Sequence, residues 1–227
     1  MANDRWERLA PASGLVFVAL LIVQGALSGP PPRADDPTSK IMTYFTDHRG
    51  GILAGWYLVG LGVVFFFWFL GSLRNALARA EGGTGRLSAI AFGGGVALAA
   101  IALASGGANA ALAYKVAGEG NAAVVRALFD FQNLAGNVFA WFPAAAMIIA
   151  TSVVMIRTSS SSKWLGWAGL LAGTFLALVA GGALAESGPM APGDAISFIA
   201  FILFGLWVLA LSILMLVWKG QVARPAP

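Results

Sequence analysis

The segment FDFQNLAGN, near the middle of the chain, carries the polar side chains best placed to do chemistry within an apolar sequence. Asp130, Asn133 and Asn137 are spaced i, i+3 and i+7 and so share one face of a helix, with Arg126 one turn before Asp130. In a membrane such side chains are satisfied only by other helices, water or a ligand. The spacing predicts a polar stripe that leads from the outer surface into the membrane, with Gln132 pointing elsewhere.

Two more amide side chains lie at a comparable depth in other apolar runs. Gln24 belongs to the first run and Asn109 to the third, and both lie toward the outer half of the membrane. With the stripe they would form a shared polar pocket in the outer leaflet. The alternative is structural. Arg126 and Asp130 would then form an ion pair at the interface, and the amides would join helices at about 0.6 kcal/mol each.

The residue inventory excludes most catalytic sites. The chain has no cysteine and one histidine, which excludes thiol nucleophiles, iron–sulfur clusters, bis-histidine haem and multi-histidine metal sites. The interiors of the first, second, fifth and sixth apolar runs hold no ionisable residue, which argues against an ion-coupled transporter and an intramembrane protease. We therefore expect no catalytic residues, no cofactor and no enzymatic activity.

A second group of polar residues lies in the loops: Asp35, Asp36, Asp47, His48 and Glu186. These side chains would bind a cation if their loops converged. Their spacing matches neither a calcium nor a zinc motif, and acidic loop residues are ordinarily solvated. We therefore expect no metal site.

The composition indicates that membrane-spanning helices position these polar residues. Of the 227 residues, 59% are apolar and 11% charged, and the mean hydropathy is +0.80, which is typical of a protein embedded in a lipid bilayer. Six apolar runs each approach or exceed the ~20 residues that cross a membrane as a helix. They cover residues 9–28, 51–73, 87–114, 134–156, 164–185 and 195–218. The sequence predicts one all-α domain over residues 1–227; the first run also resembles a signal peptide, a second interpretation that stays open.

Two stretches do not fit simple crossings and tight turns. The loop from Gly29 to Gly50 begins with prolines, and its apolar residues around Tyr44 predict a short interfacial helix. The 36 residues from Asn121 to Ile156 would measure about 54 Å as one helix, so the part before Leu134 must project, bend or lie at the interface. Pro143 predicts a kink or break in the fourth crossing.

Basic residues orient the six crossings. The N-terminus, second loop, fourth loop and C-terminus carry nine: Arg5, Arg8, Arg74, Arg79, Arg86, Arg157, Lys163, Lys219 and Arg224. The other side carries five, in the first and third loops, and most of the acidic residues. Positively charged loops favour the cytoplasm. We expect both termini to be cytoplasmic in the plasma membrane, and the net charge of +4 then requires no nucleic-acid partner.

Glycine is abundant and points to close helix packing. Gly51 and Gly55 form one GxxxG pair, and Gly169 and Gly173 form another. The third run contains five more glycines, which predicts a central position in the bundle: Gly93, Gly94, Gly95, Gly106 and Gly107. We expect most of these faces to pack within the chain; a homo-oligomer or a membrane protein partner is the alternative.

Several motifs resemble a group of uncharacterised six-pass integral membrane proteins from bacteria of the high-GC Gram-positive type. They are a P-x-x-x-D stretch before Tyr-Phe, Asp-His-Arg at the second helix, ALFDFQNLAGNVFAWFPAA, KWLGWAGLLAG and ESGPMAPGD. Together they cover most of the chain. The resemblance implies the six-helix architecture and assigns no catalytic residue, because no activity is established for the group.

The residues and the topology together predict a binding protein. We expect a six-helix bundle that binds or passes a small amphipathic or lipid-like molecule through the outer-leaflet pocket. The rival hypothesis is a non-catalytic accessory or assembly subunit that docks a larger membrane complex through its glycine-rich faces.

Overall fold

The chain folds as a bundle of helices in the computed structural model, which describes residues 10–158, 163–185 and 187–222. No strand occurs in these ranges, so the predicted all-α class is confirmed. Six helical segments are long and apolar enough to cross a membrane. Arg5, Arg8, Arg224 and Glu186, which entered the predictions above, lie outside the described residues, as does the side chain of Lys219.

Most of the six segments are longer than the apolar runs that predicted them. They are α2 (Ser13–Ser28) with the short turn before it, α4 (Arg49–Glu81), α5 (Arg86–Ala111) with a π turn (Leu112–Val116), α6 (Ala122–Leu134) joined to α7 (Trp141–Thr158), α8 (Lys163–Val179) with a 3-10 turn (Ala180–Leu184), and α9 (Ala195–Val222). The seventh helix, α3 (Thr38–Asp47), is the short helix predicted in the first loop.

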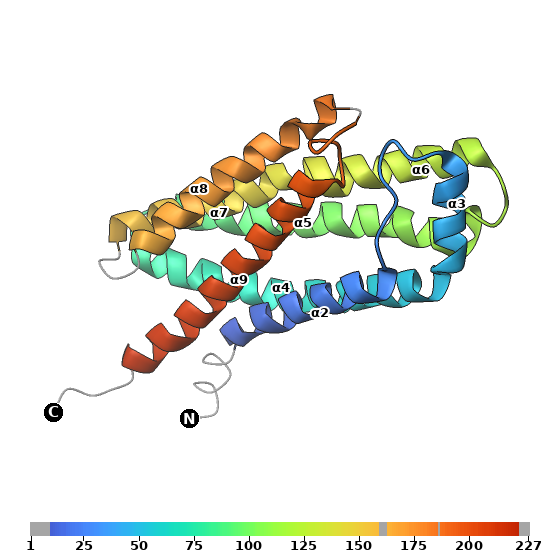
Figure 1. Cartoon of the computed structure of the whole chain (residues 1–227). Coiled ribbons are helices and arrows are strands. Elements are labelled where there is room, and N and C mark those ends of the chain that lie inside the picture. The colour runs from blue at the N-terminus through green and yellow to red at the C-terminus, as the bar shows by residue number, and fades with distance from the viewer. Residues whose placement is uncertain (1–9, 159–162, 186, 223–227) are drawn as a thin grey trace.

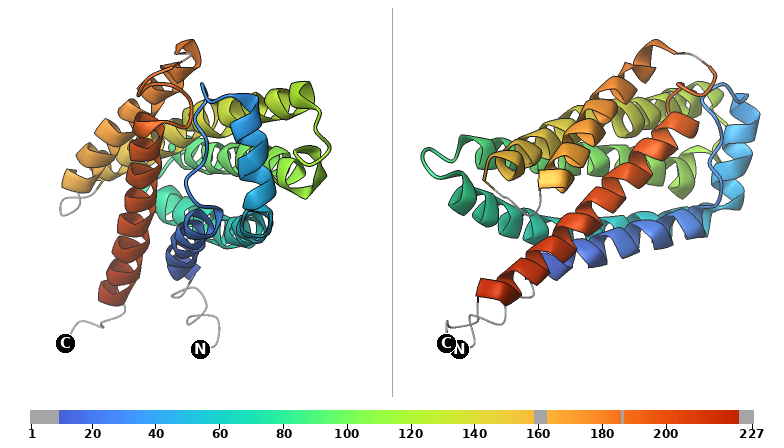
Figure 2. Two further views of the ribbon diagram at one scale, coloured as in Figure 1. Left: turned by 45° about the vertical axis from the view of Figure 1, so that its right-hand side comes forward. Right: turned by 60° about the vertical axis from the view of Figure 1, so that its left-hand side comes forward.

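The bundle has two distinct ends. Helix α3 lies across one end, here called the α3 end, whereas α2 begins and α9 ends at the opposite end (Figures 1 and 2). Helix α2 packs along α4, α8 packs along α7, and α5 contacts both α4 and α7. Helix α9 crosses the outside of the bundle diagonally (Figure 1).

Glycines allow the close contacts that hold α5 in this central position. A methyl group built on Gly94 would lie 2.6 Å from the carbonyl oxygen of Pro143, so α5 and α7 touch through their backbones there. Gly95 faces Leu70 of α4, and Gly106 faces the ring of Trp56. The third crossing therefore lies between α4 and α7, as expected, and these three glycines make its close contacts.

The two predicted GxxxG pairs also pack within the chain. Gly51 and Gly55 face α2, where a methyl group on Gly55 would lie 3.1 Å from Gln24 Cγ. Gly169 and Gly173 face α7, and a methyl group on Gly173 would lie 2.7 Å from Ile149. These four positions are therefore occupied by helices of the same protein.

The long fourth segment is helical from Ala122 to Thr158, with a π turn (Ala135–Phe139) between α6 and α7. The amide of Ala140 donates to Ala135 O at 2.9 Å, a π-type bond. Pro143 follows directly and has no N–H for Phe139 O, so the change of helix type occurs where the proline predicted a break. Helix α6 extends this segment to the α3 end.

Candidate functional site

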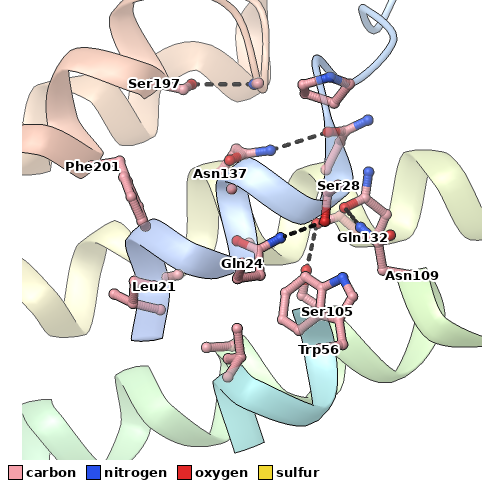
Figure 3. A pocket seen from close by; sticks show the side chains of 18 of the residues that line it. Leu21, Gln24, Ser28, Trp56, Ser105, Asn109, Gln132, Asn137, Ser197 and Phe201 are labelled. Carbon is pink, nitrogen blue, oxygen red and sulfur yellow. Dashed lines mark hydrogen bonds between the residues drawn. The ribbon is translucent and has the colours of Figure 1, made fainter. Parts of the chain in front are cut away.

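A cavity of about 870 Å³ lies among α2, α4, α5, the α6–α7 segment and α9 (Figure 3). Aromatic rings form much of its wall. The rings of Phe17 and Phe66 pack at a tilt of 32° with centroids 4.6 Å apart, and Phe204 packs against both of them and against Trp141. No charged side chain lines the cavity among the described residues. The cavity is therefore mostly apolar, and the polar side chains in its wall are uncharged.

Amide and hydroxyl groups gather on one part of this wall. Four of the six predicted site residues line the cavity: Gln24, Asn109, Asn133 and Asn137. Asn137 Nδ2 donates to Asn133 Oδ1 at 3.0 Å. Gln24 Nε2 donates to Ser28 Oγ at 3.1 Å (Figure 3). Side chains from α2, α5 and the α6 segment thus meet at one cavity, as the shared-pocket hypothesis requires.

Gln132 is part of this site, and the expectation that it points elsewhere is wrong. Its side chain is buried, lines the cavity, and accepts a hydrogen bond from Asn109 Nδ2 at 3.0 Å (Figure 3). Ser105 Oγ donates to the backbone oxygen of Gln132 at 2.9 Å. The reason is apolar packing: Val125 and Phe129 are fully buried, and Gln132 continues their helix face. The buried face of α6 is therefore rotated by one residue from the polar stripe.

That rotation places Arg126 and Asp130 outside the cavity lining. They form the ion pair of the structural alternative, with Arg126 Nε 3.0 Å from the carboxylate of Asp130. Arg126 also donates from Nη2 to Ala34 O at 2.7 Å and from Nη1 to Asp36 O at 3.2 Å. The pair thus holds the loop Gly29–Pro37, here called the strap, against α6.

The strap covers the α3 end of the cavity, and Pro30, Pro31 and Pro32 form part of the lining. It is fixed at its start by Tyr44, whose hydroxyl donates to Ser28 O at 2.8 Å. Burial raises the pKa of Tyr44 to about 12, so this donor stays protonated over the physiological range.

The second half of the strap is held by charges. Asp36 accepts hydrogen bonds from Lys40 Nζ and from the Arg33 amide, both at 2.8 Å, and these bonds hold the pKa of Asp36 below its ordinary value. Arg33 Nε also lies 3.7 Å from Asp194, in the loop before α9. The strap therefore connects α3, α6 and that loop.

The loop before α9 closes on the amide pair through Gly193. A methyl group on Gly193 would lie 3.1 Å from Asn133 Oδ1 and 3.2 Å from Asn137 Nδ2. Its φ of +84° also favours glycine. The close approach lets the loop backbone cover the two asparagines.

Two buried donors in the lining have no partner. Asn133 Nδ2 and Trp141 Nε1 lack a hydrogen-bond acceptor in the structure, although both side chains line the cavity. Their residues are 6% and 4% exposed. Buried N–H groups ordinarily have partners, so these two donors are exceptions. Each nitrogen has less than 1 Å² of accessible surface, so other atoms of the two side chains form the cavity wall.

The acidic loop residues do not form a metal site within the described ranges, where no three His, Asp or Glu side chains come together. Asp36 is engaged by Lys40, and the ring of His48 stacks on Tyr44 with centroids 4.9 Å apart. Glu186, the fifth member of the predicted group, lies outside the described residues.

The aromatic lining was not predicted from the sequence. Trp141, Phe204 and Phe45 belong to long apolar stretches, where nothing in their spacing separates a cavity wall from an ordinary core. Only Gln132 carried a usable signal, because it directly follows the apolar pair Val125 and Phe129 on the helix face.

Comparison with known proteins adds no functional assignment. No family model matches the chain, and neither a curated protein nor a solved structure matches it. The bacterial group suggested by the motifs stays a prediction. The helices themselves support a coarser conclusion: the chain is an integral membrane protein with six membrane-spanning helices, and all of them except α8 contribute to the wall of the aromatic cavity.

Proposed function

We propose that this protein is a non-catalytic binding protein that holds or passes an uncharged, amphipathic, lipid-like molecule in the cavity. The observation that carries the proposal is the joining of an aromatic chamber to a cluster of neutral amides, with no charged side chain among the described lining residues. Binding sites for small molecules combine apolar walls with a few polar groups in this way. The volume of about 870 Å³ is within the ordinary range for such sites.

The side of the cavity between α2 and α9 suits entry from the bilayer. The two helices meet away from the α3 end, where Phe17 contacts Phe204 and Gly14 faces Ser212. Nearer the α3 end, Leu21 of α2 and Phe201 of α9 both line the cavity (Figure 3). Phe198 also lines it and is 64% exposed. We expect an apolar molecule to enter the chamber sideways between α2 and α9 without crossing water.

Charge supports a cavity in the outer leaflet of the plasma membrane. Among the described side chains, the end opposite α3 carries five basic residues and one acidic residue: Arg74, Arg79, Arg86, Arg157, Lys163 and Glu81. The α3 end also has five basic residues but six acidic ones. Positive loops favour the cytoplasm, which leaves both termini cytoplasmic and the amides near the outer face.

The direct test is native mass spectrometry of the full chain extracted from its own membrane in mild detergent. We expect a reproducible small-molecule adduct that is reduced in Asn133→Leu and Asn137→Leu, because both changes remove amide groups from the cavity while keeping side-chain size. Asn75→Leu is the matched control, since Asn75 is exposed on α4 and lies outside the lining.

Absence of any adduct from the unchanged protein, together with a stoichiometric protein partner, would overturn the proposal in favour of the accessory subunit. The GxxxG pairs do not favour that rival, because all four glycines face helices of this chain.

A further inference from the structure

The cavity has a polar half near the α3 end and an apolar half farther away. The hydroxyl and amide side chains of its described lining all lie in the half nearer α3: Gln24, Ser28, Tyr44, Ser105, Asn109, Gln132, Asn133, Asn137 and Ser197. Farther along the same helices the lining is apolar or aromatic: Phe17, Leu21, Val63, Phe66, Leu98, Ala99, Ala140, Trp141, Phe201 and Phe204. On α5 the wall runs from Leu98 to Asn109, about 16 Å at 1.5 Å per residue.

Four aromatic rings, here called the aromatic floor, close the apolar half. Phe17 of α2 and Phe66 of α4 have ring centroids 4.6 Å apart. The Phe204 ring of α9 lies 6.4 Å from Phe17, 6.3 Å from Phe66 and 6.4 Å from Trp141 of α7. The next turn of each of three of these helices is fully buried: Leu70, Ala144 and Val208. The cavity therefore ends at the aromatic floor, and a bound molecule enters and leaves on the α3 side of it.

The amides of the polar half offer both acceptors and donors to a ligand. Within the described part of the chain, the side-chain oxygens of Gln24, Asn109 and Asn137 accept no hydrogen bond, and Gln132 Nε2 donates none. Unlike Asn133 Nδ2, none of these four atoms is among the fully buried ones. A ligand group that only accepts, such as an ether or ester oxygen, would match the amide N–H groups alone. A hydroxyl both donates and accepts, so it matches both kinds of group.

The lining also restricts the charge of the ligand. Its described residues include no Lys, Arg, His, Asp or Glu. A carboxylate, phosphate or ammonium group would therefore be buried there without an ion partner, which is strongly unfavourable. A neutral hydroxyl group carries no such cost.

We infer that the cavity binds an uncharged lipid whose head carries hydroxyl groups, with the head against the amides of Gln24, Asn109 and Gln132 and the apolar part on the aromatic floor. This inference rests on the proposed function and adds the class of the head and the orientation of the ligand. Two kinds of lipid share the chemistry: one with a glycerol head and one with a neutral sugar head.

The first experiment compares probes that differ in their hydroxyl groups. Full-length protein is delipidated in lauryldimethylamine oxide, a detergent without hydroxyls. It is titrated with 1-O-decylglycerol, with decyl glucoside and with the fully O-methylated form of each, and bound mass is read by native mass spectrometry. We expect at least one hydroxylated probe to bind about tenfold or more tightly than its methylated form, because its hydroxyls donate to the amide oxygens. The preferred probe identifies the head.

Asn109→Leu supplies the residue-specific arm. It removes an amide from the polar half and keeps the side-chain size, so the preference for the hydroxylated probe over its methylated form should fall about fivefold. Asn75→Leu is the matched control, because Asn75 is exposed on α4 outside the lining, and it should leave the preference unchanged. Gln24→Leu repeats the test if Asn109→Leu fails to elute as a folded monodisperse species.

The second experiment locates the two ends of the ligand. The preferred probe is made with a photoreactive diazirine at the end of its chain, and a matched probe carries the diazirine beside the head. After irradiation, labelled residues are identified by peptide mass spectrometry. We expect the chain-end probe to label residues within one helical turn of the aromatic floor, and the matched probe to label the polar half.

The outcomes separate this inference from the proposed function. Equal affinity for the hydroxylated and methylated probes would overturn the hydroxyl assignment and leave lipid binding intact, as would equal preferences in Asn109→Leu and Asn75→Leu. Chain-end labelling of the polar half, or of residues outside the lining, would overturn the orientation. Failure of every probe, with no adduct on the protein from its own membrane, would reject both.

Discussion

Arg126 holds the strap at one end of the cavity without lining the cavity itself. Its guanidinium joins the Asp130 carboxylate to two strap carbonyls, Ala34 O and Asp36 O. Hydrogen bonds to a charged group contribute more than neutral ones, about 1.5 to 3 kcal/mol each. Arg126 and Asp130, which the sequence predicted as pocket-lining residues, therefore lie outside the lining and hold the strap in place.

Replacing Arg126 with Met should loosen the strap. The Arg33 side chain is 67% exposed, and the peptide bond after it ends at Ala34, whose carbonyl Arg126 holds. We expect trypsin to cleave after Arg33 at least about tenfold faster in Arg126→Met, measured as the rate of fragment appearance by mass spectrometry. Arg49→Met is the control, because Arg49 bonds to Tyr114 O and does not contact the strap. Equal cleavage rates in the two variants would argue against this role.

Alanine substitutions at Gly193 and Gly188 distinguish the effect of backbone strain from the effect of contact with the Asn133–Asn137 pair. Both have a φ of +84°, so alanine costs each about 1 kcal/mol or more in backbone strain. A methyl group at Gly188 meets nothing within 4 Å, whereas at Gly193 it meets Asn133 and Asn137. We expect both alanine variants to lower the unfolding temperature and only Gly193→Ala to lose the bound adduct. Loss in both, or in neither, would contradict the assigned contact.

Helix α5 shows at the scale of elements why glycine position matters more than glycine number. Adjacent glycines in its sequence have opposite environments. Gly94 faces the α7 backbone and Gly106 faces Trp56, whereas Gly93 and Gly107 have open space around them. The sequence indicated close packing of this helix, and the structure shows which of its glycines make the contacts.

Alanine substitutions at neighbouring glycines of α5 should therefore have opposite effects on the stability of the protein. Gly94→Ala and Gly106→Ala should destabilise by about 1 to 3 kcal/mol, because the added methyl groups force the helices apart. Gly93→Ala and Gly107→Ala should be neutral or stabilising by up to about 1 kcal/mol, because alanine favours a helix over glycine. Thermal unfolding in one detergent measures all four. Destabilisation by Gly93→Ala equal to that by Gly94→Ala would contradict the packing described.

At the scale of the whole molecule, the absence of cysteine makes orientation easy to test. Asp35→Cys places a thiol in the strap, and Thr84→Cys places one in the loop between α4 and α5. We expect a membrane-impermeant maleimide to label the first in intact cells and the second only after permeabilisation, because basic loops stay in the cytoplasm. The reverse pattern would place the cavity in the inner leaflet.

Composition and the lengths of the apolar runs were enough to predict the all-α class and the six crossings. A hydrocarbon layer requires about 20 apolar residues per helix and leaves no lipid-exposed backbone group unpaired, so composition and run length suffice for both. The excess length of residues 121–156 predicted that the part before Leu134 projects, bends or lies at the interface, and in the structure α6 continues the segment to α3.

Tertiary packing, in contrast, selects which residues line the cavity. Neighbouring residues on a helix point about 100° apart, so a shift of one position in the buried face brings Gln132 inside and leaves Asp130 outside. That face is chosen by Val125 and Phe129, which pack against α3, far away in the chain, and against the π turn that follows α5. Polar spacing cannot report such long-range packing, because the burial of apolar groups contributes more free energy than the placement of a single amide.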